Sequence, residues 1–199
     1  MGTNFICIVQ FLLWRLGVLA DEGVFVDECL FKKYDVGHGS GWARVDMRAE
    51  QKDITRAGHQ VQDAVMMVVA MTTEEVLPIT LPVPQPETVT GFLTEWWCEH
   101  ILIPTMLHKG KTFVVMDNAR VHRRNVLRAL FHVHRLQVHF LPPYSPWFAP
   151  PEKIFLSTHM RCAKDVEWSR GDFIRNVCNI LHTDTPRECR RICEICGWD

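Results

Sequence analysis

The sequence lacks the excess of positive charge that marks many nucleic-acid-binding proteins. Its 22 Lys and Arg residues are balanced by 23 Asp and Glu residues, which gives a formal net charge of -1. Because Lys and Arg make most contacts to nucleic-acid phosphates, this balance argues against tight non-specific binding by the surface as a whole. A local basic patch remains compatible with it.

A membrane-spanning run and a targeting segment are also missing. The apolar stretch at 5–20 is interrupted by Gln10 and Arg15 and is too short for a membrane span. It has no basic start and no convincing cleavage site, so we do not expect a signal peptide. We interpret the stretch as a buried helix or strand that leads into the fold, and we expect no membrane partner.

The sequence has no internal repeat and no low-complexity tract, and its eight cysteines do not suggest a disulfide framework. Without a secretory context we expect reduced thiols in an intracellular protein. Cys189, Cys193 and Cys196 lie closest together. Their spacing fits one buried stripe of a helix or, with Cys178, a zinc site, and both interpretations stay open.

What is present is a pattern of short apolar runs and amphipathic segments, 47% hydrophobic overall, which can bury a sizeable core. The apolar runs predict strands at 24–26, 42–45, 64–71, 112–116 and 137–141, with an edge strand or extended segment at 76–83. Helical spacing predicts helices at 87–102, 123–132, 171–182 and 186–196, and one that begins at Pro150-Pro151. Strands followed by strands that alternate with helices indicate an α/β layer fold.

Three carboxylates stand where a metal site can be built. Asp27 follows the apolar run at 24–26, Asp117 follows the run at 112–116, and Glu152 lies in the first turn of the helix at Pro150. Hard cations such as Mg²⁺ prefer oxygen ligands, and two such ions can support phosphodiester chemistry. A single acidic residue at a strand end is more often a solvated cap, so this interpretation depends on the surrounding sequence.

Three motifs surround these carboxylates. They are Val26-Asp27-Glu28; the run 114–122, Val-Val-Met-Asp-Asn-Ala-Arg-Val-His; and the run 140–146, Phe-Leu-Pro-Pro-Tyr-Ser-Pro. Between Asp117 and Glu152 there are 34 residues. In this order and at this spacing, the motifs resemble those of the DDE superfamily endonucleases, and in particular the catalytic domain of mariner-type (Tc/mariner-like) transposases.

The resemblance implies a ribonuclease H-like fold, which is an α/β fold with a mixed central sheet flanked by helices. It implies that Asp27, Asp117 and Glu152 are the catalytic triad and the ligands of Mg²⁺ or Mn²⁺. The implied reaction is metal-dependent cleavage of a DNA strand by water, followed by attack of the free 3′ hydroxyl on target DNA. DNA is then the partner, a homo-oligomer on paired DNA ends is expected, and the location is the nucleus if the source is eukaryotic.

The resemblance also divides the chain and suggests DNA contacts. The implied catalytic domain covers 23–165, between an apolar lead-in segment at 1–22 and a helical, cysteine-containing tail at 166–199. The residues expected to contact DNA lie just after Asp117 and are Arg120, His122, Arg123 and Arg124, with Arg128 at the same helical spacing. The alternative is a solvated helix face for the arginines and a surface position for His122.

Two departures from the family pattern support a rival hypothesis. Trp147 and Ala149 stand where the family usually has Asp and Asn, and such polar side chains often fix a loop by local hydrogen bonds. The family's helix-turn-helix DNA-recognition region has no counterpart in the sequence. The alternative is therefore a degenerate or host-adapted transposase-derived domain that acts only as a DNA- or protein-binding module.

Overall fold

The computed structural model describes residues 2–32, 64–119, 122, 124–162 and 170–199, so the strand expected at 42–45 lies outside the described residues. Five strands form one sheet in the order β3-β2-β1-β4-β5. Their bounds are Gly23–Lys32 (β1), Ala64–Met71 (β2), Leu81–Pro84 (β3), Phe113–Met116 (β4) and Gln137–Phe140 (β5). β2 runs antiparallel to β1 and β3, whereas β4 runs parallel to β1 and β5. The expected mixed sheet is confirmed.

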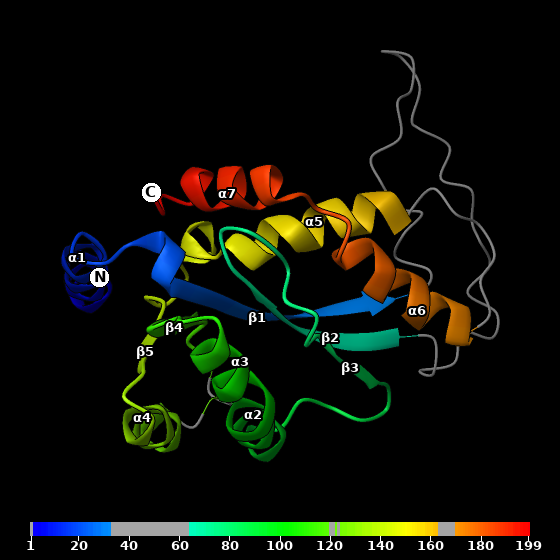
Figure 1. Ribbon diagram of the computed structural model, residues 1–199, viewed down its shortest axis with the longest axis horizontal. Coiled ribbons are helices and arrows are strands. Elements are labelled where there is room, and N and C mark those ends of the chain that lie inside the picture. Colours follow the sequence, from blue (N-terminus) through cyan, green and yellow to red (C-terminus); the bar gives the residue numbers. More distant parts are fainter. Residues whose placement is uncertain (1, 33–63, 120–121, 123, 163–169) are drawn as a thin grey trace, which may run out of the picture.

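Helices cover both faces of the sheet (Figure 1). One layer contains α2 (Gly91–Trp97), α3 (Ile103–His108) and α4 (Arg124–Val133); the other contains α5 (Pro150–Cys162), α6 (Arg170–Leu181) and α7 (Pro186–Ile195). Successive side chains of β1 alternate between the two layers, since Val24 and Val26 pack with the first and Phe25 and Phe31 with the second. The two buried cores therefore lie on opposite faces of one sheet.

β1 is longer than the run 24–26 predicted. Asp27 and Glu28 were expected to close the strand, but its antiparallel pairing with β2 continues from Phe25↔Met71 to Lys32↔Ala64. The apolar residues that follow, among them the buried Phe31, keep one face of the strand in the core. Asp27 is therefore not at a strand end, and only the parallel pairing with β4 stops before it.

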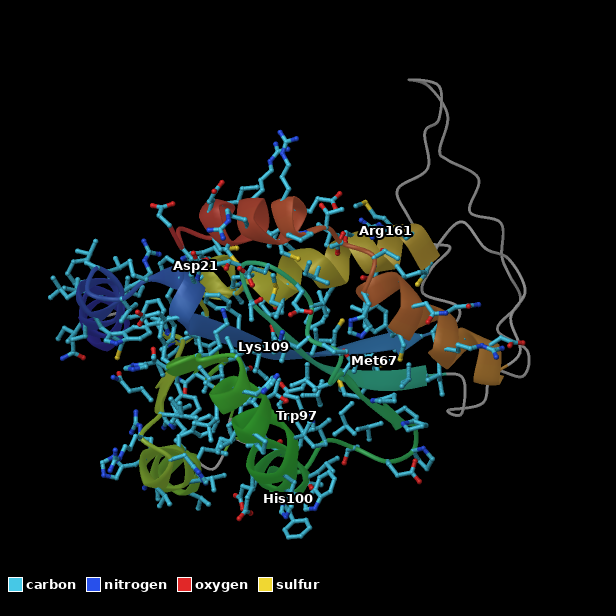
Figure 2. The ribbon with its side chains drawn as sticks, viewed as in Figure 1. Asp21, Met67, Trp97, His100, Lys109 and Arg161 are labelled. Atoms are coloured by element: carbon cyan, nitrogen blue, oxygen red, sulfur yellow. The ribbon has the colours of Figure 1, made fainter. Side chains whose placement is uncertain are left out.

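The helix expected at 87–102 begins later and continues further. Thr90 caps α2, because its hydroxyl accepts a hydrogen bond from the Leu93 N–H at 3.2 Å. A π-helical turn, Cys98–Leu102, then leads into α3, and the Ile103 N–H bonds to the Cys98 carbonyl five residues back. This wider turn accommodates Pro104, which would clash inside a regular α-helix. Trp97 (labelled in Figure 2) is fully buried and donates from Nε1 to the Ile79 carbonyl at 3.1 Å.

The N-terminal apolar stretch is a helix, α1 (Gly2–Arg15), but most of it is not buried. Phe11 is buried and Trp14 packs beside it, whereas Phe5, Ile6 and Leu13 are exposed. The prediction of a helix or strand was right and the prediction of burial was wrong, because only one side of this helix meets the fold. None of the helices in the described part of the chain combines the length and apolar character needed to cross a membrane.

The C-terminal helices belong to the same core as the sheet. Residues of α6 and α7 pack in one buried cluster with Phe11 of α1 and Phe25 of β1, so the core extends beyond the expected domain limits of 23–165. Cys189, Cys193 and Cys196 are buried in this cluster, which confirms the interpretation as a buried stripe. Burial raises the pKa of Cys189 to about 11 and that of Cys193 to about 12, so both thiols are protonated at neutral pH.

Candidate active site

Asp27 and Asp117 occupy equivalent positions on neighbouring parallel strands. The last β1–β4 pair is Val26↔Met116, so each aspartate is the next residue after that pair. Parallel strands lie about 4.8 Å apart, and the register therefore brings both carboxylates to the same place at the end of the shared ladder. Local bonds fix them further: Asp27 Oδ1 accepts from the Glu28 N–H at 2.8 Å, and Asp117 Oδ1 accepts from the Ala119 N–H at 3.1 Å.

Glu152 lines one cavity with these two aspartates and belongs to α5. The segment before it is ordered by backbone hydrogen bonds: Phe148 N–H to the Ser145 carbonyl at 3.2 Å, and Ala149 N–H to the Pro146 carbonyl at 3.0 Å. α5 begins at Pro150, as expected, so Glu152 lies in its first turn. The helix dipole there favours a carboxylate.

The three carboxylates line one cavity of about 560 Å³. They come from β1, from the residue after β4 and from α5, so the cavity gathers segments that are far apart in the sequence. The rest of its wall is the loop at 141–146 together with Asn118, Ala119, Arg124 and Ala149. The cavity is open to solvent beside Glu152, whose side chain is exposed, and it can admit a large polar substrate.

Burial makes Asp27 an unusual carboxylate. Asp27 is 7% exposed. Its burial, and then the negative charges of Asp117, Glu28 and Glu152, raise the pKa of its carboxyl to about 8, although the Glu28 N–H acts in the opposite direction. A divalent cation would relieve this repulsion and favour the ionised form. Strongly perturbed carboxyl groups in a cavity are typical of functional sites.

His122 lies behind Asp117, between two carboxylates. Its Nε2 is 2.8 Å from Asp117 Oδ1 and 3.4 Å from Glu28 Oε2. Burial alone would lower the pKa of His122, but hydrogen bonds to Asp117 and Glu28 and their charges raise it to about 10. For Asp117, burial acts in the opposite direction and would raise the pKa of the carboxyl. The hydrogen bonds from His122 and Ala119 outweigh burial and hold that pKa below its ordinary value. His122 is 3% exposed and is therefore buried beside these carboxylates, and its expected contact with DNA stays a prediction.

Of the other residues expected to contact DNA, the structure describes Arg124 and leaves Arg120 and Arg123 outside the described residues. Arg124 is exposed at the start of α4, and its Nη1 donates to Asn118 Oδ1 at 2.9 Å. It also lines the cavity of the three carboxylates. Of the arginines expected to contact DNA, at least Arg124 therefore lies beside the three carboxylates.

Sequence reasoning missed Glu28 as a partner of His122 and Tyr144 as a rim residue. Glu28 was detectable, because the apolar run at 29–31 indicates that the strand continues and alternation then places Glu28 on the face opposite Asp27. Tyr144 has a φ of 56° and is 90% exposed on the cavity rim. A positive φ is uncommon for a bulky residue, and no sequence signal marks it here.

The donor set fits a hard divalent cation. Asp27, Asp117 and Glu152 offer only carboxylate oxygens, which Mg²⁺ and Mn²⁺ prefer over softer metals. Within the described ranges, the group whose ligand atoms all lie within 4.8 Å of one another is Glu28, Asp117 and His122. Asp117 belongs to both sets, and His122 already bonds to its Oδ1. Asp27 and Glu152 do not belong to this group, so the described side chains place only Asp117 of the expected triad within that distance of two other ligand atoms.

Solved structures of other proteins share this fold. The Mos1 strand transfer complex is 15% identical over 96% of this chain and 56% of the Mos1 chain, with a TM-score of 0.73. The Mos1 mariner paired-end complex with Mn gives a TM-score of 0.74 at 15% identity, covering 96% of this chain and 57% of that chain. The catalytic domain of Mos1 mariner transposase gives 0.66 at 14% identity, covering 96% and 84%.

These likenesses confirm the ribonuclease H-like fold, and the chain spans little more than half the length of the Mos1 chains in the complexes. No curated protein sequence matches the chain. A family model described as DDE superfamily endonuclease matches residues 22–174, which is more than half of the sequence. The chain therefore belongs to the DDE superfamily endonucleases.

Proposed function

We propose that this chain is the catalytic part of a mariner-type transposase, which cleaves DNA strands and joins the freed 3′ hydroxyl to target DNA. The observation that supports the proposal best is the single cavity lined by Asp27, Asp117 and Glu152. Their order and their spacing in the sequence resemble the triad of the DDE superfamily endonucleases, to which the chain belongs. The Mos1 complexes with Mn and with Mg support a divalent-metal cofactor.

The metal would be held by Asp27, Asp117 and Glu152. When bound, Mg²⁺ or Mn²⁺ supplies Lewis-acid activation of the attacking oxygen and stabilisation of the leaving oxygen in phosphodiester cleavage. The two aspartates are fixed by the ends of a rigid ladder, and rigid supports are what such a site needs. Glu152 closes the site from α5, where its carboxylate is exposed to an approaching substrate.

The remaining residues of the site position the carboxylates and offset negative charge. Protonated His122 holds Asp117 in one orientation and offsets the charge of Glu28, which keeps Asp117 ionised. Arg124 supplies a cation at the edge of the cavity, suited to a DNA phosphate next to the cleaved bond. Neither cleavage nor joining needs a covalent intermediate with the enzyme, because positioning and electrostatics supply the catalysis.

Cleavage of supercoiled plasmid tests the proposal. The wild-type chain should convert plasmid to the nicked form in the presence of Mn²⁺ or Mg²⁺ and not in excess EDTA. Asp117→Asn keeps the size of the side chain and removes its charge, so nicking should fall by at least about 100-fold, as is usual when charge stabilisation at a reacting centre is lost. Glu99→Ala is the matched control, since it removes an exposed carboxylate outside the cavity.

Nicking that survives Asp117→Asn would reject the triad, whatever the metal dependence. The absence of nicking by the wild-type chain would favour the rival proposal of a module that only binds. Calorimetric titration with Mn²⁺ then separates the two, because the binding module predicts no specific Mn²⁺ site that Asp117→Asn removes.

One observation weighs against the binding-only module. Trp147 and Ala149 replace the polar residues expected before the glutamate, yet backbone hydrogen bonds order the turn at 146–148 without them. Ala149 is buried in the cavity wall and Trp147 is exposed outside it. The altered loop therefore still brings Glu152 to the cavity of the two aspartates.

A further inference from the structure

A second cavity adjoins the catalytic one. It has a volume of about 370 Å³ and lies between α1, α4 and β5. It shares Asn118, Arg124 and the loop at 141–143 with the catalytic cavity, so the two cavities adjoin along this wall. A polymer that reaches the three carboxylates can therefore extend into this groove without leaving the protein surface.

The two cavities differ sharply in charge. Among the described residues, three carboxylates and one arginine line the catalytic cavity, whereas the second is lined by Arg124 and Arg128 and by no carboxylate. His139, also in its wall, adds no charge at neutral pH, because burial and the nearby Arg128 lower its pKa to about 4. The groove is thus a positive extension of a negative site, which suits a polyanion whose reacting phosphate sits at the metal-binding end.

Arg128 offers a guanidinium that no described carboxylate neutralises. It is exposed on α4, and its guanidinium lies 5.6 Å from the centre of the Phe140 ring. Within the described part of the chain, no carboxylate forms an ion pair with it. The opposite wall is α1, which contributes Cys7, Gln10 and Trp14.

α1 is fixed in this position by packing. Trp14 stacks on His139 of β5 at 3.5 Å between ring centres and an interplanar angle of 17°, and Phe11 lies against Phe148 at 5.4 Å. The aromatic wall is therefore rigid, while Gln10 and Arg128 offer polar groups from the two sides. A narrow groove with one apolar wall and cations opposite suits a DNA strand, whose sugars and bases alternate with phosphates.

We propose that the groove between α1, α4 and β5 binds the stretch of DNA backbone next to the scissile phosphate, with Arg128 as its principal phosphate contact. The proposal rests on the proposed function, since it assumes that DNA is the substrate. It adds a place for the flanking strand and gives α1 a role as the outer wall of the binding site.

Two measurements on the full chain test the groove. The first is binding of a fluorescent DNA duplex in EDTA over a range of salt concentrations. Arg128→Gln should weaken binding several-fold and lower the slope of log affinity against log salt by about 1, as expected for one lost phosphate contact. Gln10→Glu should weaken it as well, by placing a negative charge opposite Arg128. Arg191→Gln, on the exposed side of α7, removes the same charge elsewhere and should leave binding unchanged.

The second measurement uses Cys7 as a native probe of the groove. Cys7 is partly exposed and lines the groove, whereas the partly exposed Cys178 lies on α6, outside it. Bound DNA should slow alkylation of Cys7 by iodoacetamide several-fold, as read by peptide mass spectrometry, and leave Cys178 unchanged. Arg128→Gln should reduce this protection at equal DNA concentration.

The outcomes separate the groove from the proposed function. If DNA binds and metal-dependent nicking occurs, but Arg128→Gln behaves as Arg191→Gln does and Cys7 stays unprotected, the groove proposal is overturned and the endonuclease stands. If the chain neither binds DNA at low salt nor nicks plasmid, both are overturned. Protection of Cys7 by an acidic peptide but not by DNA would also overturn the proposal, since it would assign the groove to a protein partner.

Discussion

Burial of the Asp27 carboxylate lowers the stability of the metal-free fold. The carboxylate lies inside a strand that is buried on both faces, with three other acidic side chains near it. Folding without a metal ion must therefore either protonate Asp27 or keep a charge away from water. The pKa of about 8 expresses that cost.

We expect Asp27→Asn to stabilise the metal-free protein. The pKa of Asp27 rises from 3.8 to about 8 on folding, so its favourable contribution is complete below about pH 4 and is lost as pH rises through 8. Asparagine does not ionise, so the gain in the free energy of unfolding should be about 1–3 kcal/mol above pH 8 and small near pH 4. Urea unfolding in EDTA at both pH values measures it.

Added Mg²⁺ or Mn²⁺ should reverse the order of the two proteins. The ion binds the folded wild-type protein and raises its midpoint of unfolding, whereas Asp27→Asn should gain little. Glu99→Asn, an exposed position, serves as the control for loss of one negative charge. A variant that is less stable than wild type at pH 9 in EDTA would show that the buried charge is not costly.

At the scale of the elements, the sequence predicted which segments are helices or strands better than it predicted where they begin and end. The strand β4, one residue shorter than the predicted run at 112–116, and the start of α5 at Pro150 were predictable, because the apolar run at 113–116 and a proline in the first turn are local signals. The continuation of β1 past Asp27 depends on β2, a partner in a distant part of the sequence. The continuation of the helix past Pro104 depends on the π-helical turn at Cys98–Leu102, which local spacing does not reveal.

α7 offers a prediction at this scale. Thr185 and Glu188 form a capping box: the Glu188 N–H donates to the Thr185 hydroxyl at 3.3 Å, and the Thr185 N–H donates to Glu188 Oε2 at 2.7 Å. Thr185→Ala should lower the free energy of unfolding by about 1 kcal/mol, because it removes the acceptor for an N-terminal N–H. Thr185→Ser keeps the hydroxyl and should restore most of that loss in the same urea titration.

The capping prediction also separates stability from function. α7 packs on α5 but does not line either cavity, so the rate of plasmid nicking by Thr185→Ala should match that of wild type at a temperature where both are folded. A large loss of nicking with intact folding would show that α7 positions α5, and with it Glu152.

For the molecule as a whole, the sequence predicted three carboxylates that line one cavity, but it did not predict the surroundings of that cavity. Asp27, Asp117 and Glu152 were predictable, because short motifs at a fixed spacing mark them. The pairing of His122 with Glu28 and the groove beneath α1 were not, because both join segments whose approach only the folded chain defines. The exposed side of α1 was mispredicted for the same reason, since hydropathy indicates which residues are apolar and not how many neighbours reach them.

Trp198 connects the parts that local signals could not place. It is 2% exposed and contacts Phe11 of α1, Phe25 of β1 and Phe113 of β4, and its Nε1 donates to the Phe148 carbonyl at 2.9 Å. Phe148 belongs to the turn at 146–148 that leads into Glu152. Trp198 therefore fixes both the inner side of α1 and the turn that leads to Glu152.

Two substitutions separate these roles of Trp198. Trp198→Ala should cost about 3–5 kcal/mol in the free energy of unfolding, as is usual for removal of a large buried aromatic side chain. Trp198→Phe keeps a ring in the core but removes the hydrogen bond to the Phe148 carbonyl. Loss of that bond should lower the free energy of unfolding by about 1 kcal/mol, in addition to the effect of the smaller ring on packing. If that bond holds the turn before Glu152, Trp198→Phe should also weaken Mn²⁺ binding measured by calorimetry, in protein that is fully folded at the outset. Unchanged Mn²⁺ affinity would limit Trp198 to packing, and the backbone bonds at Ser145 and Pro146 would then suffice to place Glu152.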